Sequence, residues 1–299
     1  MTIGELIEAG ARQLADAGVS FGHGTDNAFD EAAWLVLWQL GLPLDSPLNG
    51  QDSASNRPVT ESEKEQVATL FRARIDTRQP AAYLTHEAWL QGVAFYVDQR
   101  SIVPRSLVAE LLVHGSIDPW LGTHTHQVLD LCTGNGSLAV IAEQVYPDVQ
   151  VTGSDLSPDA LAVARINVDK HGLQHRITLL QSDGLASPEL RSRDPFDLIL
   201  CNPPYVNTQS MAALPLEYCA EPALALAGGT DGMDFIRQLL RDAPAHLSEQ
   251  GVLVLEIGNE RDHFEAAFPR LEVVWLETSA GEDQVLLATR ESLVNHDYP

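Results

Sequence analysis

The sequence of 299 residues has few of the features that mark secreted, metal-binding or membrane proteins. Its three cysteines, Cys132, Cys201 and Cys219, form neither a metal-ligand spacing nor an even-numbered disulfide framework. No apolar run is long enough to cross a bilayer. The first residues, 1–5, lack the basic start and apolar core of a signal peptide. We therefore expect a protein of the reducing cytoplasm, with neither a membrane segment nor a bound metal.

Basic residues are also scarce. Eighteen lysines and arginines stand against 42 aspartates and glutamates, which gives a formal net charge of −24. Nucleic-acid binders normally present a basic surface, because phosphate contacts supply much of their affinity. The charge does not exclude a local basic patch, but its long-range field should repel nucleic acid and attract cationic partners. General solubility, or a salty cytoplasm, would explain the same charge almost as well.

The first 80 residues are predicted to form a small helical domain. Thr2 and Glu5 make a capping box for a helix that runs to about Ala17. Further helices are expected over 26–40 and 60–76. The second helix would turn one stripe of residues towards the core, namely Phe29, Ala33, Trp34, Leu37 and Trp38. This part of the sequence carries no catalytic pattern, so we interpret it as an accessory domain that shapes or recognises a substrate.

A junction between domains is expected next. The segment 89–98 is predicted to form a β-hairpin, and a short helix should run from Ser106 towards His114. Junctions of this kind favour clefts. Arg105 stands just before the short helix, where it is either a plain surface residue or part of such a cleft.

From Gln127 the pattern changes to strands that alternate with helices, which is typical of a parallel sheet. Expected strands cover 128–131, 149–152, 177–181, 196–200 and 251–257, followed by a C-terminal pair over 273–276 and 284–288. The last residues, 291–299, are predicted to be a frayed tail.

Polar residues follow the first three of these strands. The turn 132–136 contains glycines that allow a ligand to approach the backbone closely. Asp155 lies roughly 20 residues beyond that turn, where an acidic group can bind both hydroxyls of a ribose. Asp183 follows the third strand and could accept from an adenine amine. Ala139 replaces the third glycine of the dinucleotide fingerprint, which favours a nucleoside without a pyrophosphate.

The fourth strand ends in Cys201-Asn202-Pro203-Pro204-Tyr205. Ligands of open α/β sheets bind at this end of the strands. Asn202 can accept one N–H of a planar amine, and the Pro203 carbonyl can accept the other, because Pro204 has no N–H to compete for it. Tyr205 offers a flat face for stacking. The alternative is a rigid proline-rich turn with an exposed tyrosine.

Together, the stretch 130–136, Asp155 and the stretch 202–205 resemble the motifs of the protein-(glutamine-N5) methyltransferases. The similarity extends to 221–232 and to Val103-Pro104-Arg105, and covers most of the chain from about Pro80 to Arg290. The stretches 82–85, 87–89 and 95–98 are similar to the branch that modifies the third protein of the large ribosomal subunit. The release-factor branch usually has an acidic residue where Ser106-Leu107 stands here. Three positions depart from the usual family pattern, namely Asn135, Ser137 and His86 in place of Ser, Cys and Gly.

The resemblance implies a seven-stranded, Rossmann-like class I methyltransferase sheet over 107–290, a helical domain over 1–80 and a hairpin linker over 81–106. It implies that S-adenosylmethionine is the methyl donor and that a glutamine of a basic ribosomal protein is the acceptor. The cofactor contacts it implies are Asp130, Cys132, Thr133, Gly134, Asn135, Gly136, Asp155, Leu156, Asp183, Gly184 and Asn202. The substrate contacts it implies are Asn202, Pro203, Pro204, Tyr205, Arg105 and Phe95, with Asn202, Pro203 and Tyr205 acting in catalysis.

Three alternatives stay open at this point. The substrate could be a release factor. A methyltransferase of nucleic-acid amines would use a similar Asn-Pro-Pro-aromatic motif on a flipped base, although the charge and the hairpin argue against it. A non-catalytic binding module that kept only the fold is the third alternative, and the joint presence of Gly134, Gly136, Asp155 and Asn202 argues against it.

Overall fold

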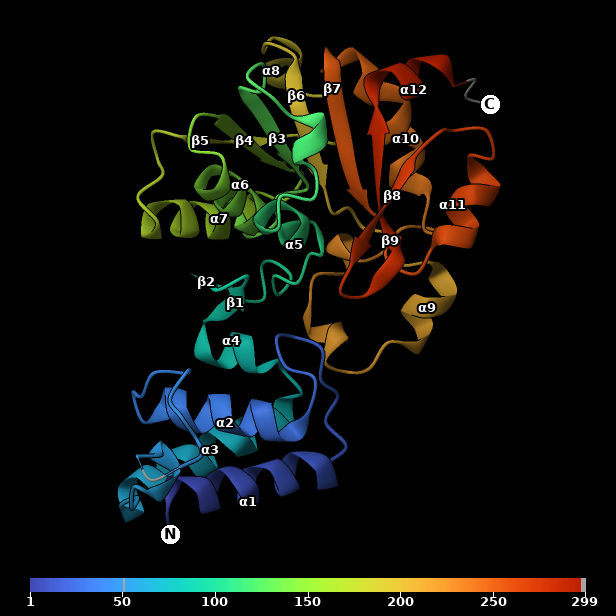
Figure 1. Cartoon of the computed structure of the whole chain (residues 1–299). Coiled ribbons are helices and arrows are strands. Elements are labelled where there is room, and N and C mark those ends of the chain that lie inside the picture. The colour runs from blue at the N-terminus through green and yellow to red at the C-terminus, as the bar shows by residue number, and fades with distance from the viewer. Residues whose placement is uncertain (51, 297–299) are drawn as a thin grey trace.

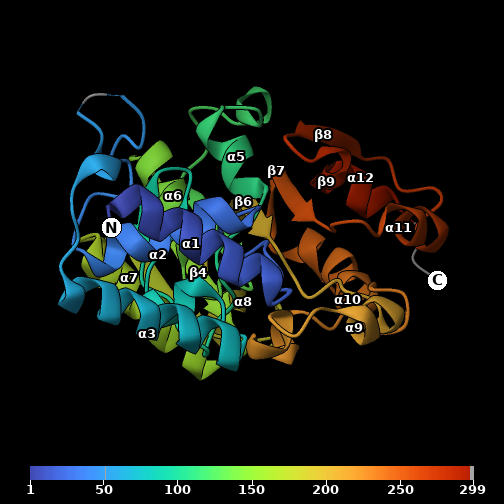
Figure 2. The same cartoon turned by 90° about the horizontal axis from the view of Figure 1, so that it is seen from below.

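The computed structural model describes residues 1–50 and 52–296, and it consists of a helical part below an α/β part (Figure 1). The helical part contains α1 (Ile3–Asp16), α2 (Ala28–Gln39), the 3-10 turn η1 (Ala54–Asn56), α3 (Glu61–Thr77) and α4 (Ala81–Thr85). Seen from below, α1 and α3 lie in front of the α/β part (Figure 2). The helices predicted for this region are confirmed.

Capping fixes where the first and third helices begin. Thr2 and Glu5 form the expected capping box of α1, and Thr60 and Glu63 form another at α3. One detail of the predicted apolar stripe is wrong, because Phe29 on α2 is 47% exposed. It lies in the first turn of the helix, outside the contact that buries Ala33, Trp34 and Leu37.

A short antiparallel hairpin joins the two parts. It consists of β1 (Ala88–Leu90) and β2 (Val93–Phe95), as expected. The apolar core of the helical part continues past the predicted boundary at residue 80 and includes Val97 and Val103. Then follow α5 (Val108–Val113) and the 3-10 turn η2 (Asp118–Trp120).

The α/β part is built on a seven-stranded sheet in the order β5-β4-β3-β6-β7-β9-β8. Its strands are β3 (Gln127–Leu131), β4 (Gln150–Asp155), β5 (Ile177–Gln181), β6 (Phe196–Cys201), β7 (Leu247–Glu256), β8 (Val274–Thr278) and β9 (Gly281–Thr289). The strands from β5 to β7 are parallel, while β9 is antiparallel to both of its neighbours. This confirms the predicted methyltransferase sheet.

Helices cover both faces of the sheet. The helices of this part are α6 (Ser137–Val145), α7 (Pro158–Lys170), α8 (Pro188–Arg191), α9 (Thr208–Ala213), α10 (Asp234–Asp242), α11 (Arg261–Ala267) and α12 (Arg290–Asn295), with 3-10 turns η3 (Tyr218–Ala220), η4 (Ala223–Ala225) and η5 (Ala243–Ala245). Of these, α9 has no buried residue and lies below the sheet (Figure 1). Successive residues of β6 enter opposite cores, with Leu198 and Leu200 in one and Ile199 and Cys201 in the other. A strand buried on both faces is expected to be apolar throughout.

The predicted frayed tail is wrong for residues 291–296. Thr289 caps α12, and Leu293 on that helix is 1% exposed within the core that also contains Leu286 and Phe264. Burial of this leucine holds the segment on the sheet. Residues 297–299 lie outside the described part of the chain. No helix among the described residues is long and apolar enough to span a bilayer.

Candidate active site

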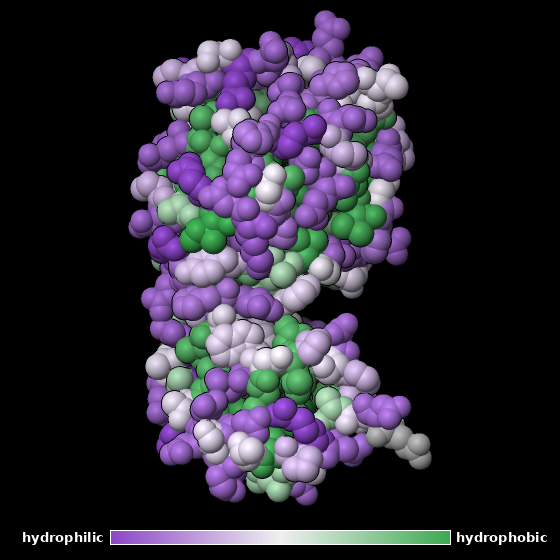
Figure 3. Space-filling view, turned by 90° about the vertical axis from the view of Figure 1, so that its left-hand side faces the viewer, coloured by the Kyte–Doolittle hydropathy of each residue, from purple (hydrophilic) through white to green (hydrophobic). Residues whose placement is uncertain are grey.

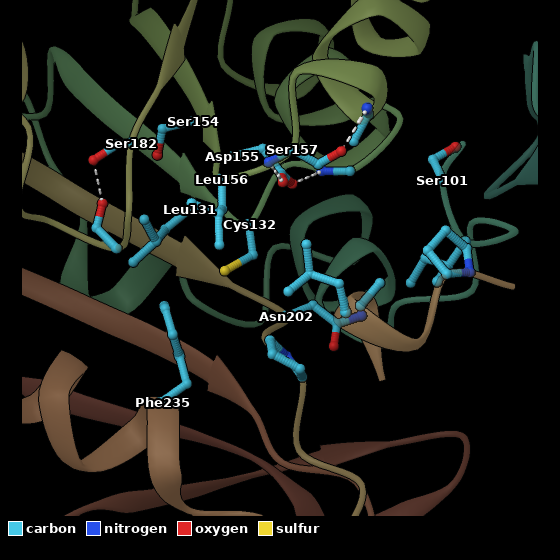
Figure 4. Close-up of a pocket in the computed structure, with 18 of the residues that line it drawn as sticks. Ser101, Leu131, Cys132, Ser154, Asp155, Leu156, Ser157, Ser182, Asn202 and Phe235 are labelled. Atoms are coloured by element: carbon cyan, nitrogen blue, oxygen red, sulfur yellow. Dashed lines mark hydrogen bonds between the residues drawn. The ribbon is translucent and has the colours of Figure 1, made fainter. Parts of the chain in front are cut away.

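A cavity lies at the carboxyl ends of β3, β4, β5 and β6 (Figure 4). The chain runs outward from β3 through β4 to β5 and then returns to β6, on the other side of β3. The order of the strands therefore reverses between β3 and β6, and open α/β sheets bind ligands at such a switch point. The residues that line the cavity are Arg100, Ser101, Ile102, Leu131, Cys132, Gly134, Ser154, Asp155, Leu156, Ser157, Ala160, Ser182, Asp183, Gly184, Asn202, Pro204, Pro222, Leu224, Ala225 and Phe235.

The glycine turn after β3 is braced from beneath by Asp130. This carboxylate is fully buried and accepts from Thr133 Oγ1 at 2.5 Å and from the Ala139 N–H at 2.9 Å. Burial raises the pKa of Asp130 to about 7, although both hydrogen bonds act to lower it. Cys132 has a positive φ of 62°, which an L-residue adopts only under constraint. Asp130 therefore stabilises the turn from beneath, while Cys132 and Gly134 line the cavity.

Asp155 closes β4 and lies beside the same turn. Its carboxylate accepts from the Gly134 N–H and from the Ser157 N–H, each at 2.9 Å. Burial is the main cause that raises the pKa of Asp155 above its ordinary value, against the lowering effect of these backbone donors. Each oxygen keeps a free acceptor position, since a carboxylate offers about four in all. Asp155 can thus hold the turn and still bind hydroxyl groups in the cavity.

Asn202 enters the cavity from the end of β6. In Figure 4 it lies across the hollow from Asp155 and Ser157, with the Cys132 side chain between them and Phe235 below. Within the described part of the chain, the Asn202 side chain makes no hydrogen bond. Its amide is therefore available to a ligand.

The Tyr205 side chain is held by contacts to its hydroxyl and to its ring. Its hydroxyl donates to Glu256 Oε1 at 3.2 Å, while Ser106 Oγ and the Leu107 N–H donate to Oε2 of the same carboxylate. A Cβ at Gly258 would lie 2.5 Å from the Tyr205 ring, so only glycine fits there. Burial raises the pKa of Glu256. Burial also raises the pKa of Tyr205, and the nearby Glu256 carboxylate raises it further. Glu256 was not predicted as a site residue, because it lies at the end of an apolar strand.

The remaining predicted site residues fall into two groups. Thr133, Asn135 and Pro203 are sequence neighbours of lining residues and Gly136 is two positions from Gly134, but none of the four lines the cavity. Arg105 and Phe95 lie elsewhere. Arg105 donates to Glu221 through both terminal nitrogens, at 2.7 and 2.8 Å. Phe95 is fully buried and packs 5.4 Å from the His171 ring, so the structure does not bring it to the cavity.

Several lining residues were missed by the sequence reasoning. Ser154 directly precedes Asp155 at the end of β4, Ser182 directly precedes Asp183 after β5, and Phe235 belongs to α10. The wall formed by 100–102 and 222–225 was also missed. The first segment adjoins the stretch 103–105 and the second lies inside the stretch 221–232, and both stretches carried the family resemblance. His86, at the family's usual glycine, has a φ of 52°, which explains why glycine suits that position.

The cavity fits a polar nucleoside with an apolar face. The hydroxyls of Ser101 and Ser154 are buried without a partner among the described residues. Such groups are normally hydrogen-bonded, so a bound ligand would relieve them. Leu156 and Phe235 supply apolar surface beside the acceptors Asp155 and Asp183.

Comparison with known proteins identifies the family of the chain. Residues 109–229 match the family described as Methyltransferase small domain. The ribosomal protein uL3 glutamine methyltransferase of Bordetella pertussis is 52% identical over 98% of this chain and 96% of its own length. The ribosomal protein uL3 glutamine methyltransferase of Neisseria meningitidis serogroup A is 46% identical over 99% of this chain and 95% of its own length.

Solved structures show the same fold at much lower identity. The catalytic domain of hMettl16 in complex with an RNA hairpin has a TM-score of 0.52 at 12% identity, covering 80% of this chain and 85% of that one. A methyltransferase from Pyrococcus furiosus has a TM-score of 0.50 at 17% identity, covering 76% of this chain and 98% of that one. These likenesses concern the fold alone, whereas the near full-length relatives decide the family. The chain belongs to the ribosomal protein uL3 glutamine methyltransferase family.

Proposed function

We propose that this chain transfers a methyl group from S-adenosylmethionine to the side-chain amide nitrogen of a glutamine in ribosomal protein uL3, in the cytoplasm. The observation that carries the proposal is the unpaired Asn202 amide, which lines the same cavity as Asp155 at the switch point of the sheet. The names of the full-length relatives favour uL3 over a release factor as the acceptor.

The residues around the cavity fit the cofactor. Asp155 would accept from the ribose hydroxyls, and Asp183 from the adenine amine. Leu156 and Phe235 would cover the faces of the base, and Gly134 would let the backbone approach the ligand. When bound, S-adenosylmethionine supplies an electrophilic methyl group.

Positioning of the glutamine is the main task of the protein. The nitrogen of an amide is a weak nucleophile, because its lone pair is delocalised into the carbonyl. Asn202 Oδ1 and the Pro203 carbonyl would accept its two N–H groups and aim the lone pair at the methyl carbon. Tyr205, anchored on Glu256, would hold the amide plane by stacking. No strong base is needed, because the nitrogen becomes far more acidic once it has formed the new bond.

Methyl transfer to purified uL3 and to a purified release factor, measured with labelled cofactor, tests the choice of substrate. We expect uL3 to be labelled and the release factor to stay unlabelled. Labelled release factor with unlabelled uL3 would reverse the choice, and labelled RNA would change the class of enzyme.

The reaction with uL3 should also slow as salt is added. The chain carries a net charge of −24, and attraction to a basic partner speeds encounter in a way that salt screens. Initial rates at a low concentration of uL3 would be compared across a salt series. Cofactor affinity serves as the control and should change little. A rate that is independent of salt would contradict electrostatic recognition.

Asp155→Ala should weaken binding of S-adenosylmethionine by about 1.5–3 kcal/mol, the usual scale of a hydrogen bond to a charged group. Titration calorimetry on the folded variant measures it. Because Asp155 also holds the Gly134 N–H, Asp155→Asn is the matched control. It keeps one acceptor for the turn and should lose less affinity than Asp155→Ala. Unchanged affinity in a folded Asp155→Ala protein would rule out the ribose contact.

A further inference from the structure

Two segments outside the sheet border the cavity, and we call them the outer wall: residues 100–102 and 222–225. The only regular structure in the outer wall is the single 3-10 turn η4. Leu224, which lines the cavity, is 57% exposed. Beyond the wall, Val206 pairs with the backbone of Leu226 and Gly228, each at 2.8 Å. These bonds hold the C-terminal end of 222–225, so its N-terminal end must be held by another contact, which we call the anchor.

Glu221 provides that anchor and also holds the other segment. Its Oε1 accepts from the Val103 N–H at 2.9 Å and from Arg105 Nη1 at 2.7 Å, and its Oε2 accepts from Arg105 Nη2 at 2.8 Å. Glu221 directly precedes Pro222, and Val103 directly follows Ile102. One carboxylate therefore joins the ends of both segments of the outer wall.

Glu221 stays ionised in spite of its burial. Burial would raise its pKa, but His23 and the Arg105 guanidinium outweigh that effect and hold the pKa at about 2. Arg105 is also held over the Tyr218 ring, with its guanidinium carbon 5.4 Å from the ring centroid. The anchor is thus a charged pair that is largely removed from water.

The helical part of the protein reaches this anchor through His23. Nε2 of His23 lies 3.4 Å from Glu221 Oε2, and the His23 side chain is 2% exposed. The His23 ring packs against Tyr218 with 4.3 Å between centroids. A Cβ at Gly22 would come within 2.7 Å of the Tyr218 hydroxyl, so glycine is needed for this close approach.

A second link lies beside the first. Glu217 is also buried, and its Oε1 lies 3.5 Å from Arg74 Nη1 and 3.3 Å from Arg78 Nη1. Both arginines lie at the C-terminal end of α3 in the helical part. In Figure 1 the orange segment between α9 and α10 reaches down to the helices. Figure 3 shows the two parts as separate lobes with a notch between them on one side. Contacts through Glu217 and Glu221 therefore bridge two lobes of the molecule.

We propose that His23, a residue of the helical part, is a positioning residue for the methyltransferase cavity. Acting through Glu221, it holds the outer wall in the conformation that binds the cofactor. The inference rests on the proposed function only in taking S-adenosylmethionine as the ligand of the cavity. The helical part then has a second role besides substrate recognition, since it sets cofactor affinity.

The expected loss of cofactor affinity depends on the fraction of molecules in which the outer wall keeps the conformation that binds the cofactor. A ligand that binds one conformation loses apparent affinity in proportion to the fraction of molecules that leave it. Without the Glu221 charge, the ends of the outer wall separate and Arg105 loses its partner. Catalytic groups such as Asn202 lie outside the outer wall, so turnover at saturating cofactor should change far less than affinity.

Four variants test the proposal: Glu221→Gln, His23→Leu, His23→Gln and, as a matched control, Glu143→Gln. Glu143 is another mostly buried carboxylate beside an arginine, 3.4 Å from Arg176, but it lies on α6 away from the outer wall. For each folded variant, calorimetry gives the dissociation constant of S-adenosylmethionine. Steady-state kinetics with uL3 give KM for the cofactor and kcat separately, and hydrogen exchange reports on residues 222–226.

We expect Glu221→Gln to raise the dissociation constant about tenfold and His23→Leu several-fold, with kcat within about threefold of the wild type. Exchange over 222–226 should be faster in both. His23→Gln keeps a polar side chain beside Glu221 Oε2 and should restore most of the affinity, while Glu143→Gln should leave it unchanged. If Glu221→Gln fails to fold, the two His23 variants still decide the matter.

Wild-type affinity and unchanged exchange in folded His23→Leu would overturn the inference and leave the proposed function intact. Failure of the wild-type protein itself to bind S-adenosylmethionine would instead overturn the proposed function, and the inference with it. The two failures are thus distinguished by the wild-type titration alone.

Discussion

Replacing Asn202 by alanine is expected to lower turnover by roughly 10²-fold or more, the usual scale when a group that orients a reactant is lost. The alanine removes one acceptor for the glutamine N–H groups and lets the amide rotate away from the methyl carbon. Asn202 makes no hydrogen bond to the described residues of the protein, so the fold should survive the change. Single-turnover kinetics at saturating cofactor measure the chemical step apart from product release.

Asn202→Asp provides the matched control for the same position. An aspartate can still accept an N–H, but its negative charge lies near the positive sulfonium of the cofactor. It would stabilise that ground state more than a transition state in which the charge is being dispersed, and catalysis depends on this difference. We therefore expect both variants to bind cofactor and both to turn over slowly. A folded Asn202→Ala enzyme within a fewfold of the wild-type rate would make the Asn-Pro-Pro-Tyr motif a structural turn.

Replacing Arg74 by methionine is expected to lower the free energy of unfolding by about 3–5 kcal/mol, as when one member of a buried ion pair is removed. Arg74 is fully buried, and its Nε donates to Glu31 Oε1 at 2.7 Å while Nη2 donates to the Ser20 carbonyl at 3.0 Å. Methionine fills much of the space but leaves the Glu31 carboxylate without its counter-ion. Urea unfolding of both proteins measures the difference.

The double variant Arg74→Met with Glu31→Gln controls for the orphaned charge and should recover part of the loss. Burial already raises the pKa of Glu31 above the ordinary 4.5, against the lowering effect of Arg74. In Arg74→Met this pKa rises further, and the folded state then keeps a proton that the unfolded chain has lost. The stability of Arg74→Met should therefore fall as pH increases from the ordinary glutamate range towards the raised pKa. A loss below about 1 kcal/mol at neutral pH would mean that the pair contributes little.

Much of the sheet was predictable because its strands are short apolar runs bounded by turn residues. Successive positions such as Leu198 and Ile199 face different cores, so β6 has to be apolar from Leu198 to Cys201. Asn202 and Asp155 stand out because they interrupt this pattern at the carboxyl ends of strands. Their role as ligand contacts remains a prediction, although the structure brings both to one cavity.

What escaped prediction depends on contacts between distant parts of the chain. Glu221 and Arg105 are 116 residues apart, and no local pattern signals that one carboxylate ties two cavity segments together. Glu256 likewise reaches Tyr205 only because β7 lies beside β6 in the sheet. The burial of Phe95 was missed because a hairpin of three-residue strands gives too little alternation to show which face is covered.

The central claim is that this enzyme methylates the side-chain nitrogen of a glutamine in uL3. Mass spectrometry of the ribosomal proteins and the release factors from cells with and without the enzyme tests it most directly. We expect uL3 from cells with the enzyme to be heavier by one methyl group, placed by fragmentation on a glutamine side chain, and we expect that mass to disappear without the enzyme and return when it is restored. A uL3 mass that is identical in both kinds of cell, with a methyl group lost from a release factor instead, would contradict the claim.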